Sequence, residues 1–251
     1  MRPGGCAEAC FATRRRGENL GECSRIRRLM PVPAACLFDL DGLLLDTEPL
    51  HGEAWAAAAA HFGTALTPEQ LLQLRGRRRR DCAEQVVAWI KAEVSCDALL
   101  AIQQPIARRL MPTASANPGA AALVNWCAKH RVPMALVTSS SQDSVGTKTS
   151  GHPWIGQIET RVLGDDPALG AGKPAPDPFL LAAQRLGVAA DQCWAFEDSL
   201  AGSRAALAAG CQLWVLNPHG DGQSLRHKLP AGIWQEIKSL DQVVDQLERG
   251  D

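Results

Sequence analysis

Short apolar runs alternate with longer amphipathic segments along most of the chain. The apolar runs predict buried strands at residues 34–38, 132–138, 158–163, 192–196 and 212–216. The segments between them predict helices at 120–130, from 142 onward, and at 179–186 and 199–209. Strands that alternate with helices are joined by right-handed crossovers. We therefore predict an α/β fold with a doubly wound, Rossmann-like parallel sheet.

The stretch between the first two predicted strands has a helical pattern only. Helices are expected at 49–62, 68–75, 80–92 and 96–111, and no strand-like alternation interrupts them. We predict an all-helical cap at residues 47–115, inserted into a core made of residues 30–46 and 116–251. Such a cap would lie above the carboxyl ends of the strands and act as a lid over a substrate.

Residues 1–29 are unlike the rest, because they are rich in Arg and show no apolar periodicity. We interpret them as a disordered leader or an upstream start-codon assignment, with Met30 as the natural start. An organelle transit segment is the alternative. The acidic residues Glu8, Glu18 and Glu22 disfavour it.

The first predicted strand runs directly into Asp39-Leu40-Asp41-Gly42. Side chains two residues apart face the same side of an extended chain, so Asp39 and Asp41 can share one site. A hard cation such as Mg²⁺ would relieve their mutual repulsion, and Gly42 lets the chain turn away. A calcium loop would need polar ligands where this chain has leucines. Taken alone, the motif is equally compatible with a simple turn.

Other polar groups follow the later predicted strands, namely Ser139 and the Glu197-Asp198 pair, with Lys173 in a nearby loop. In a doubly wound sheet, ligands bind at the carboxyl ends of the strands. Together these groups suit phosphoryl transfer. Asp39 would be the nucleophile and Asp41 the general acid and base. Phosphate and Mg²⁺ would be held by Ser139, Lys173, Asp198 and Glu197.

Four segments in order resemble the motifs of the haloacid-dehalogenase superfamily: FDLDGLLLDT, VTSS, GKPAPDPF and FEDSLAG. The resemblance spans residues 36 to about 216, and the helical insertion is similar to the cap of the phosphoglucomutase-like subgroup. It implies a Mg²⁺-dependent phosphatase that acts through an aspartyl-phosphate on Asp39. It also implies metal ligation by Asp39, Asp41 (through a backbone oxygen), Asp198 and Glu197, and phosphate binding by Ser139 and Lys173, beside which we place Ser140 and Gly42.

The segments KTSGH, VLGDDP and GKPAPDPF are also similar to the pseudouridine-5′-phosphatase group, which includes plant glycerol-3-phosphate and flavin mononucleotide phosphatases. Those relatives often carry Arg where this chain has Gly151. The resemblance implies a small nucleotide-like, polyol or sugar phosphate as substrate. A phosphosugar mutase on the same scaffold is the alternative, although mutases typically carry Lys where Gln142 stands.

Two residues of the predicted cap are candidate substrate contacts. Resemblance to the mutases places Arg79 where a cap Arg grips a substrate phosphate, and His51 where a hinge His lies. Solvated helix residues are the simpler interpretation of both. We expect Lys148 and His152 to be surface residues of the helix after the second strand. Five tryptophans are expected to be packing residues: Trp126, Trp154, Trp194, Trp214 and Trp234.

Composition narrows the remaining possibilities. The formal net charge of −1 disfavours nucleic acid and membrane partners, although an RNA site over Arg75 and Arg77 to Arg80 remains a rival. The nine Cys are scattered with no CxxC pair, which indicates a reducing compartment, so we expect a cytoplasmic protein. We expect a monomer or weak dimer. A non-catalytic binding protein would not need both Asp39 and Asp41.

Overall fold

A computed structural model describes residues 32–74, 79–218, 228–229 and 234–250. The predicted leader, Met30 and the arginines Arg75, Arg77 and Arg78 lie outside these ranges. The described chain begins with a strand, continues through a helical stretch, and then alternates strands and helices, as the hydrophobic pattern predicts.

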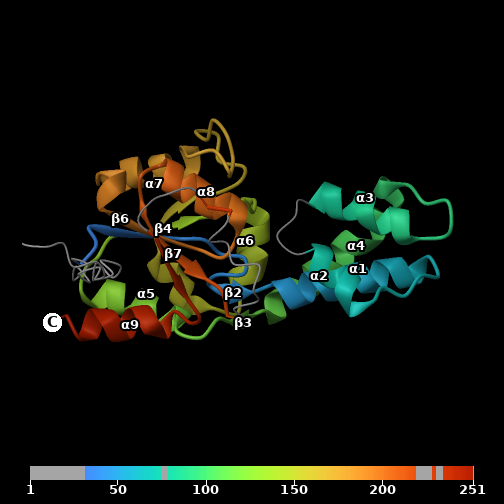
Figure 1. The fold of residues 1–251 in the computed structure, drawn as a ribbon, viewed down its shortest axis with the longest axis horizontal. Coiled ribbons are helices and arrows are strands. Elements are labelled where there is room, and N and C mark those ends of the chain that lie inside the picture. Colours follow the sequence, from blue (N-terminus) through green and yellow to red (C-terminus); the bar gives the residue numbers. More distant parts are fainter. Residues whose placement is uncertain (1–31, 75–78, 219–227, 230–233, 251) are drawn as a thin grey trace, which may run out of the picture. The chain divides into compact units, whose positions relative to one another are not determined.

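One six-stranded sheet forms the centre of the fold (Figure 1). Its strands lie in the order β5-β4-β1-β6-β7-β8, and every pairing between neighbours is parallel. The prediction of a parallel α/β sheet is therefore confirmed. The strands are β1 (Ala35–Phe38), β4 (Met134–Val137), β5 (Thr160–Val162), β6 (Cys193–Glu197), β7 (Gln212–Leu216) and β8 (Trp234–Ile237).

Strand β1 lies between β4 and β6 and is buried along its whole length. Phe38, its last residue, pairs with Leu136 on one side and Phe196 on the other. Strands in such a central position are covered on both faces, which explains why they read as continuous apolar runs. The register also brings the chain segments that follow β1, β4 and β6 to one edge of the sheet.

Helices cover both faces of the sheet (Figure 1). They are α5 (Ala120–Lys129), α6 (Gln142–Thr149), α7 (Asp177–Leu186), α8 (Leu200–Ala208) and α9 (Asp241–Glu248), with short 3₁₀ turns η1 (Met111–Thr113), η2 (Pro153–Gln157) and η3 (Ala190–Gln192). Helices α7 and α8 pack on one face of the sheet. There Phe179 of α7 and Ala205 of α8 belong to the same apolar cluster as Leu37, Val137 and Ala195 of the strands. Figure 1 shows α5 and α9 on the other face.

Residues 47–114 contain four α-helices, α1 (Glu48–His61), α2 (Pro68–Leu74), α3 (Arg79–Trp89) and α4 (Cys96–Leu110), which confirms the predicted helical insertion. They have an apolar core of their own, in which Trp55, Val86 and Leu99 are buried. None of the helices in the described ranges is long and apolar enough to cross a membrane.

A two-stranded ribbon marks where the chain enters and leaves this insertion. Strand β2 (Leu45–Asp46) pairs antiparallel with β3 (Ser115–Ala116). Next to it, Asn117 donates from Nδ2 to the carbonyl oxygens of Gly42 and Leu43, at 2.8 and 2.9 Å. The hydrophobic pattern did not predict this ribbon or the last pair of elements, β8 and α9. Strands this short, or half exposed at a sheet edge as β8 is, carry little apolar signal.

Candidate active site

Asp39 is the first residue beyond β1, and the sheet fixes its position. Its backbone N–H donates to the Phe196 carbonyl at 3.1 Å, which continues the pairing of β1 with β6 past the end of the strand. The chain then turns at Gly42, whose φ of 83° lies in the left-handed region that favours glycine. The Asp39 side chain is 91% buried, yet it lines a cavity.

Lys173 reaches Asp39 from the loop before α7, as the sequence predicts for a shared site. Its Nζ lies 2.5 Å from Asp39 Oδ1, 2.5 Å from Glu197 Oε1 and 2.8 Å from the Val137 carbonyl oxygen. All three ammonium protons therefore have acceptors. Burial alone would lower the pKa of Lys173, but the two carboxylates raise it above its usual value, so the ammonium stays charged.

Three carboxylates converge beside this lysine. Oxygen atoms of Asp39, Glu197 and Asp198 all lie within 4.8 Å of one another. Both oxygens of Glu197 are engaged, Oε1 by Lys173 and Oε2 by the Ser199 hydroxyl at 3.0 Å. Asp198 Oδ1 is buried and has no hydrogen-bond partner among the described residues.

The electrostatics of this cluster fit a bound cation. Burial, opposed by Lys173 and reinforced by the charge of Glu197, raises the pKa of Asp39 to about 7. Burial and the charge of Asp39 raise the pKa of Asp198 well above its usual value. A hard cation with carboxylate ligands would offset both effects and satisfy the free Asp198 oxygen. The residues present therefore suit Mg²⁺.

Two glycines leave room for these carboxylates. A Cβ at Gly42 would overlap the Asp198 carboxylate, and a Cβ at Gly202, the third residue of α8, would overlap that of Glu197. Any side chain at either position would have to displace an acidic group. The two motifs DxDG and EDSLAG thus end in glycine because a carboxylate fills the space of the missing Cβ.

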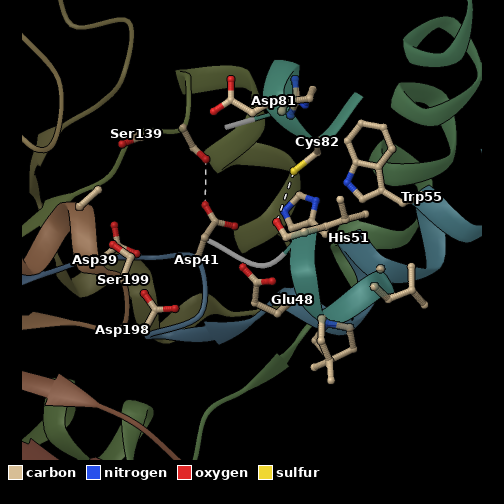
Figure 2. A pocket seen from close by; sticks show the side chains of 18 of the residues that line it. Asp39, Asp41, Glu48, His51, Trp55, Asp81, Cys82, Ser139, Asp198 and Ser199 are labelled. Atoms are coloured by element: carbon tan, nitrogen blue, oxygen red, sulfur yellow. Dashed lines mark hydrogen bonds between the residues drawn. The ribbon is translucent and has the colours of Figure 1, made fainter. Parts of the chain in front are cut away.

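Asp41 lies in a separate network with a residue that the sequence did not identify. Lys148 Nζ is 2.6 Å from Asp41 Oδ1 and 2.8 Å from the Ser140 hydroxyl. That hydroxyl donates to Asp41 Oδ2 at 2.8 Å, and the Thr47 hydroxyl donates to Oδ1 at 3.0 Å. Figure 2 shows where the Asp41 carboxylate lies beside the cavity.

The prediction that Lys148 is a surface residue was wrong. It is 4% exposed and comes from α6, three residues after the buried Val145. Residues three apart lie on the same face of a helix, so a lysine in phase with a buried valine was the available signal. The same prediction for His152 holds only in part. His152 is half buried, and its Nε2 lies 2.8 Å from the Ala114 carbonyl oxygen.

The two aspartates of the DxD motif are therefore not held by one cation alone. Asp41 is not in the acidic cluster found among the described residues, and each aspartate has its own lysine. Burial would raise the pKa of Asp41, but the ion pair with Lys148 and the Lys148 and Ser140 hydrogen bonds lower it below its usual value. The repulsion that suggested a shared metal is relieved largely by the two lysines.

A cavity of about 830 Å³ opens between this sheet edge and the helical insertion. Eight of the residues predicted as site residues line it: Asp39, Asp41, His51, Arg79, Ser139, Ser140, Lys173 and Asp198. Gly42 and Glu197 are not among the lining residues. Figure 2 shows His51 and Trp55 of α1 across from Asp39 and Asp198. Burial lowers the pKa of His51, which favours its neutral form.

Comparison with known proteins agrees with this geometry. A family model described as haloacid dehalogenase-like hydrolase matches residues 33–210. The chain is 31% identical over 225 residues to a Saccharomyces cerevisiae protein named probable pseudouridine-5′-phosphatase, an alignment that covers 83% of this chain and 94% of the yeast protein. It is 33% identical to the fructose-1-phosphate phosphatase YqaB of Escherichia coli, over 70% of this chain and 93% of that protein.

Among solved structures, a haloacid dehalogenase family hydrolase from Deinococcus radiodurans, crystallised with bound phosphate and sodium, matches with a TM-score of 0.71. It is 27% identical, and the match covers 86% of this chain and 95% of that one. The sequence, the sheet topology and these matches agree, and the chain belongs to the haloacid dehalogenase-like hydrolase family.

Proposed function

We propose that this chain is a Mg²⁺-dependent phosphatase that hydrolyses a small phosphate monoester through an aspartyl-phosphate on Asp39. The observation that carries the proposal is the arrangement around Asp39. Its carboxylate lines a cavity, is paired with a fully engaged lysine, and lies next to a buried Asp198 oxygen without a partner. The names of the relatives, which are phosphatases of small phosphate esters, support the same class of substrate.

The carboxylates around Asp39 divide into two roles. Asp39 and Asp198 would hold Mg²⁺, and we keep the prediction that the Asp41 backbone oxygen joins them. Glu197, whose oxygens are both engaged, would act by holding Lys173 in place. When bound, Mg²⁺ would supply positive charge that offsets the charge of the phosphoryl oxygens.

In the first step, an Asp39 oxygen attacks phosphorus and the bond to the ester oxygen breaks. Lys173 offsets the charge that develops on the phosphoryl group, and the leaving oxygen takes a proton from Asp41. The pKa of Asp41 is lowered in the free protein. For Asp41 to carry that proton, the anionic ester must compete for the Lys148 ammonium, because only a weakened ion pair lets the pKa of Asp41 rise.

In the second step, a water attacks the phosphorus of the aspartyl-phosphate. Asp41, now ionised, takes the proton from that water, and the bond to Asp39 breaks to release phosphate. Ser140 and Thr47 hold Asp41 in one orientation for both transfers, and Lys148 joins them when Asp41 is ionised. We therefore assign Lys148 as a positioning residue for Asp41.

The cellular setting is part of the same proposal. Six cysteines are found free among the described residues, five of them buried and Cys96 half buried. They support a reducing compartment such as the cytoplasm. We keep the prediction of a monomer or weak dimer.

The proposal is tested by phosphate release from the full chain, with and without Mg²⁺. The panel contains pseudouridine 5′-phosphate, flavin mononucleotide, glycerol 3-phosphate, fructose 1-phosphate and glucose 6-phosphate. We expect Mg²⁺-dependent release, with one ester turned over well above the rest. A parallel assay follows conversion of β-glucose 1-phosphate to glucose 6-phosphate with a bisphosphate primer.

Each outcome has a distinct meaning. Conversion in the parallel assay without phosphate release would identify a mutase and contradict the proposal. Absence of both activities from a folded protein that binds Mg²⁺ would contradict catalysis on any of these substrates and favour a binding role.

A further inference from the structure

Gln103 is a polar residue in an apolar position. The buried residues of α4 are Leu99, Gln103 and Ala107, which are spaced four apart and form one stripe along the helix. Leu99 belongs to the apolar core of the insertion, and Ala107 to a smaller cluster with Ala54 and Met111. An apolar side chain is the expected occupant of the middle position, since both of its neighbours in the stripe are apolar.

The amide oxygen of Gln103 lacks a partner in the part of the chain that the structure describes. Gln103 is only 1% exposed, and its Oε1 has no hydrogen-bond partner among the described residues. Three other buried polar residues near the site are paired: Thr47 donates to Asp41, Lys148 pairs with Asp41, and Asn117 donates to two carbonyls. Asp198 Oδ1, which is also unpaired, lies in the carboxylate cluster that suits a cation. A buried amide oxygen without a donor destabilises the fold, so folding alone does not explain a glutamine here.

The cavity offers the missing partner. Gln103 lines the same cavity as Asp39 and Asp41, on the wall that the insertion contributes with Trp55 and His51. The phosphoryl end of a monoester must lie against Asp39 and Lys173, and an ionised phosphate has no proton to donate. The group that reaches the insertion is therefore the leaving group. It can present a hydroxyl or a ring N–H to an amide oxygen, and in polyol and sugar esters the donor is a hydroxyl.

We propose that the Gln103 amide accepts a hydrogen bond from a hydroxyl of the leaving group, so that the enzyme selects polyol-type and sugar-type monophosphates over unhydroxylated ones. This inference rests on the proposed phosphatase function and assigns its specificity to one residue. A site built to hydrogen-bond a hydroxyl discriminates strongly against a substrate that lacks it, because the buried polar group is then left unpaired.

The test pairs two variants with two kinds of substrate. Gln103→Met removes the amide and keeps the length of the side chain. Gln104→Met makes the same change at the next position of α4, where the side chain is exposed. Each is assayed in the full chain, with Mg²⁺, on glycerol 3-phosphate and fructose 1-phosphate and on their alkyl analogues, propyl phosphate and hexyl phosphate.

We expect Gln103→Met to lower kcat/KM for the better hydroxylated ester about 10- to 100-fold and to change that for its alkyl analogue less than about threefold. Wild type should prefer the hydroxylated ester, and the variant should lose most of that preference. Gln104→Met should change neither the kcat/KM for the hydroxylated ester nor that for its alkyl analogue. The melting temperature of Gln103→Met should equal or exceed that of wild type, since an unpaired buried amide is removed.

Two results would overturn the assignment. An equal loss on hydroxylated and alkyl esters, or a lower melting temperature together with that loss, would mean that Gln103 only supports the packing of α4. Unchanged activity on both would mean that the amide does not contact the substrate. If wild type hydrolyses none of these four esters but releases phosphate from another ester of the panel, this inference fails and the proposed function stands. If it releases phosphate from no ester although it folds and binds Mg²⁺, the proposed function fails as well.

Discussion

The two walls of the cavity differ in how their polar groups are satisfied. At the edge of the sheet, Asp39, Asp41 and Glu197 each have a lysine or hydroxyl partner, and Asp198 Oδ1 is the exception. The wall from the insertion contains apolar side chains such as Trp55 and Leu74, with the unpaired amide of Gln103 among them. The sheet edge is thus preorganised for one reaction, while the insertion presents groups that await a substrate.

This difference predicts that substitutions at the sheet edge abolish or slow the reaction on every substrate, whereas those in the insertion change which substrate is used. The unpaired atoms fit the same division. The free oxygen at the sheet edge belongs to a carboxylate and suits a cation, while that in the insertion belongs to a neutral amide and suits a hydroxyl.

The largest expected effect is that of Asp39→Asn. It removes the proposed nucleophile with little change in volume, so phosphate release should fall at least about a thousandfold on every ester. Steady-state assays would measure the loss, and thermal unfolding should show that the variant still folds. Mg²⁺-dependent turnover near the wild-type rate would contradict the covalent mechanism.

Gly202→Ala tests whether the sheet edge tolerates one added methyl group. The new Cβ would overlap Glu197, so we expect a loss of about 2 kcal/mol or more in unfolding free energy, and reduced activity as Lys173 loses its support. Gly146→Ala is the matched control, since it also lies inside a helix but its Cβ would meet nothing within 4 Å. The control should stabilise the protein by up to about 1 kcal/mol. Equal behaviour of the two in urea denaturation would refute the packing argument.

Lys148→Met removes the partner of Asp41 from the buried face of α6. We expect kcat to fall about 10- to 100-fold on all esters, with a smaller change in KM, because Asp41 loses its orientation and the lowered pKa that the ion pair maintains. Lys129→Met, at an exposed position of α5, is the control and should leave kcat unchanged. A selective effect on one substrate would instead place Lys148 with the specificity groups.

The response to Mg²⁺ should depend on pH. In the metal-free protein the pKa of Asp39 is raised from 3.8 to about 7, so between these values the folded state holds a proton that the unfolded state lacks. The stability that this proton provides is lost as pH rises through about 7. Mg²⁺ must displace the same proton, so its apparent affinity should weaken about tenfold per pH unit below 7.

This pH dependence is measured as the rise in melting temperature on adding Mg²⁺. At each pH, the melting temperature of the metal-free protein is subtracted from that of the Mg²⁺-loaded protein. This difference removes the contribution of groups that do not contact the cation. The rise should grow from about pH 5.5 to 7.5 and should be reduced in Asp39→Asn. A rise that is constant across this range would place the cation away from Asp39.

The smallest expected effect comes from the insertion. Thr67 and Gln70 cap the start of α2 reciprocally, through hydrogen bonds of 2.9 and 3.3 Å. Thr67→Ala should lower the unfolding free energy by about 1 kcal/mol and leave kcat on a small alkyl phosphate unchanged. A large fall in kcat would mean that the insertion and the sheet edge are less independent than their polar groups indicate.

The sequence by itself determined the fold class and most of the reaction site. Runs such as 34–38 and 192–196 are apolar throughout because their strands are buried on both faces, and parallel strands place their carboxyl ends together. The positions of four residues relative to the predicted strands therefore sufficed to predict that they lie at one edge of the sheet: Asp39, Ser139, Lys173 and Asp198. Local periodicity also located the four helices of the insertion.

Only the tertiary structure decided which polar groups meet. The spacing of apolar residues places Gln103 on the buried face of α4 and Lys148 on that of α6, but it does not show which groups they meet there. Their partners, Asp41 and the cavity, are formed by segments far away in the chain, and such contacts depend on how α6 and α4 are packed. Periodicity shows which face of a helix is buried, but what covers that face is set by long-range packing.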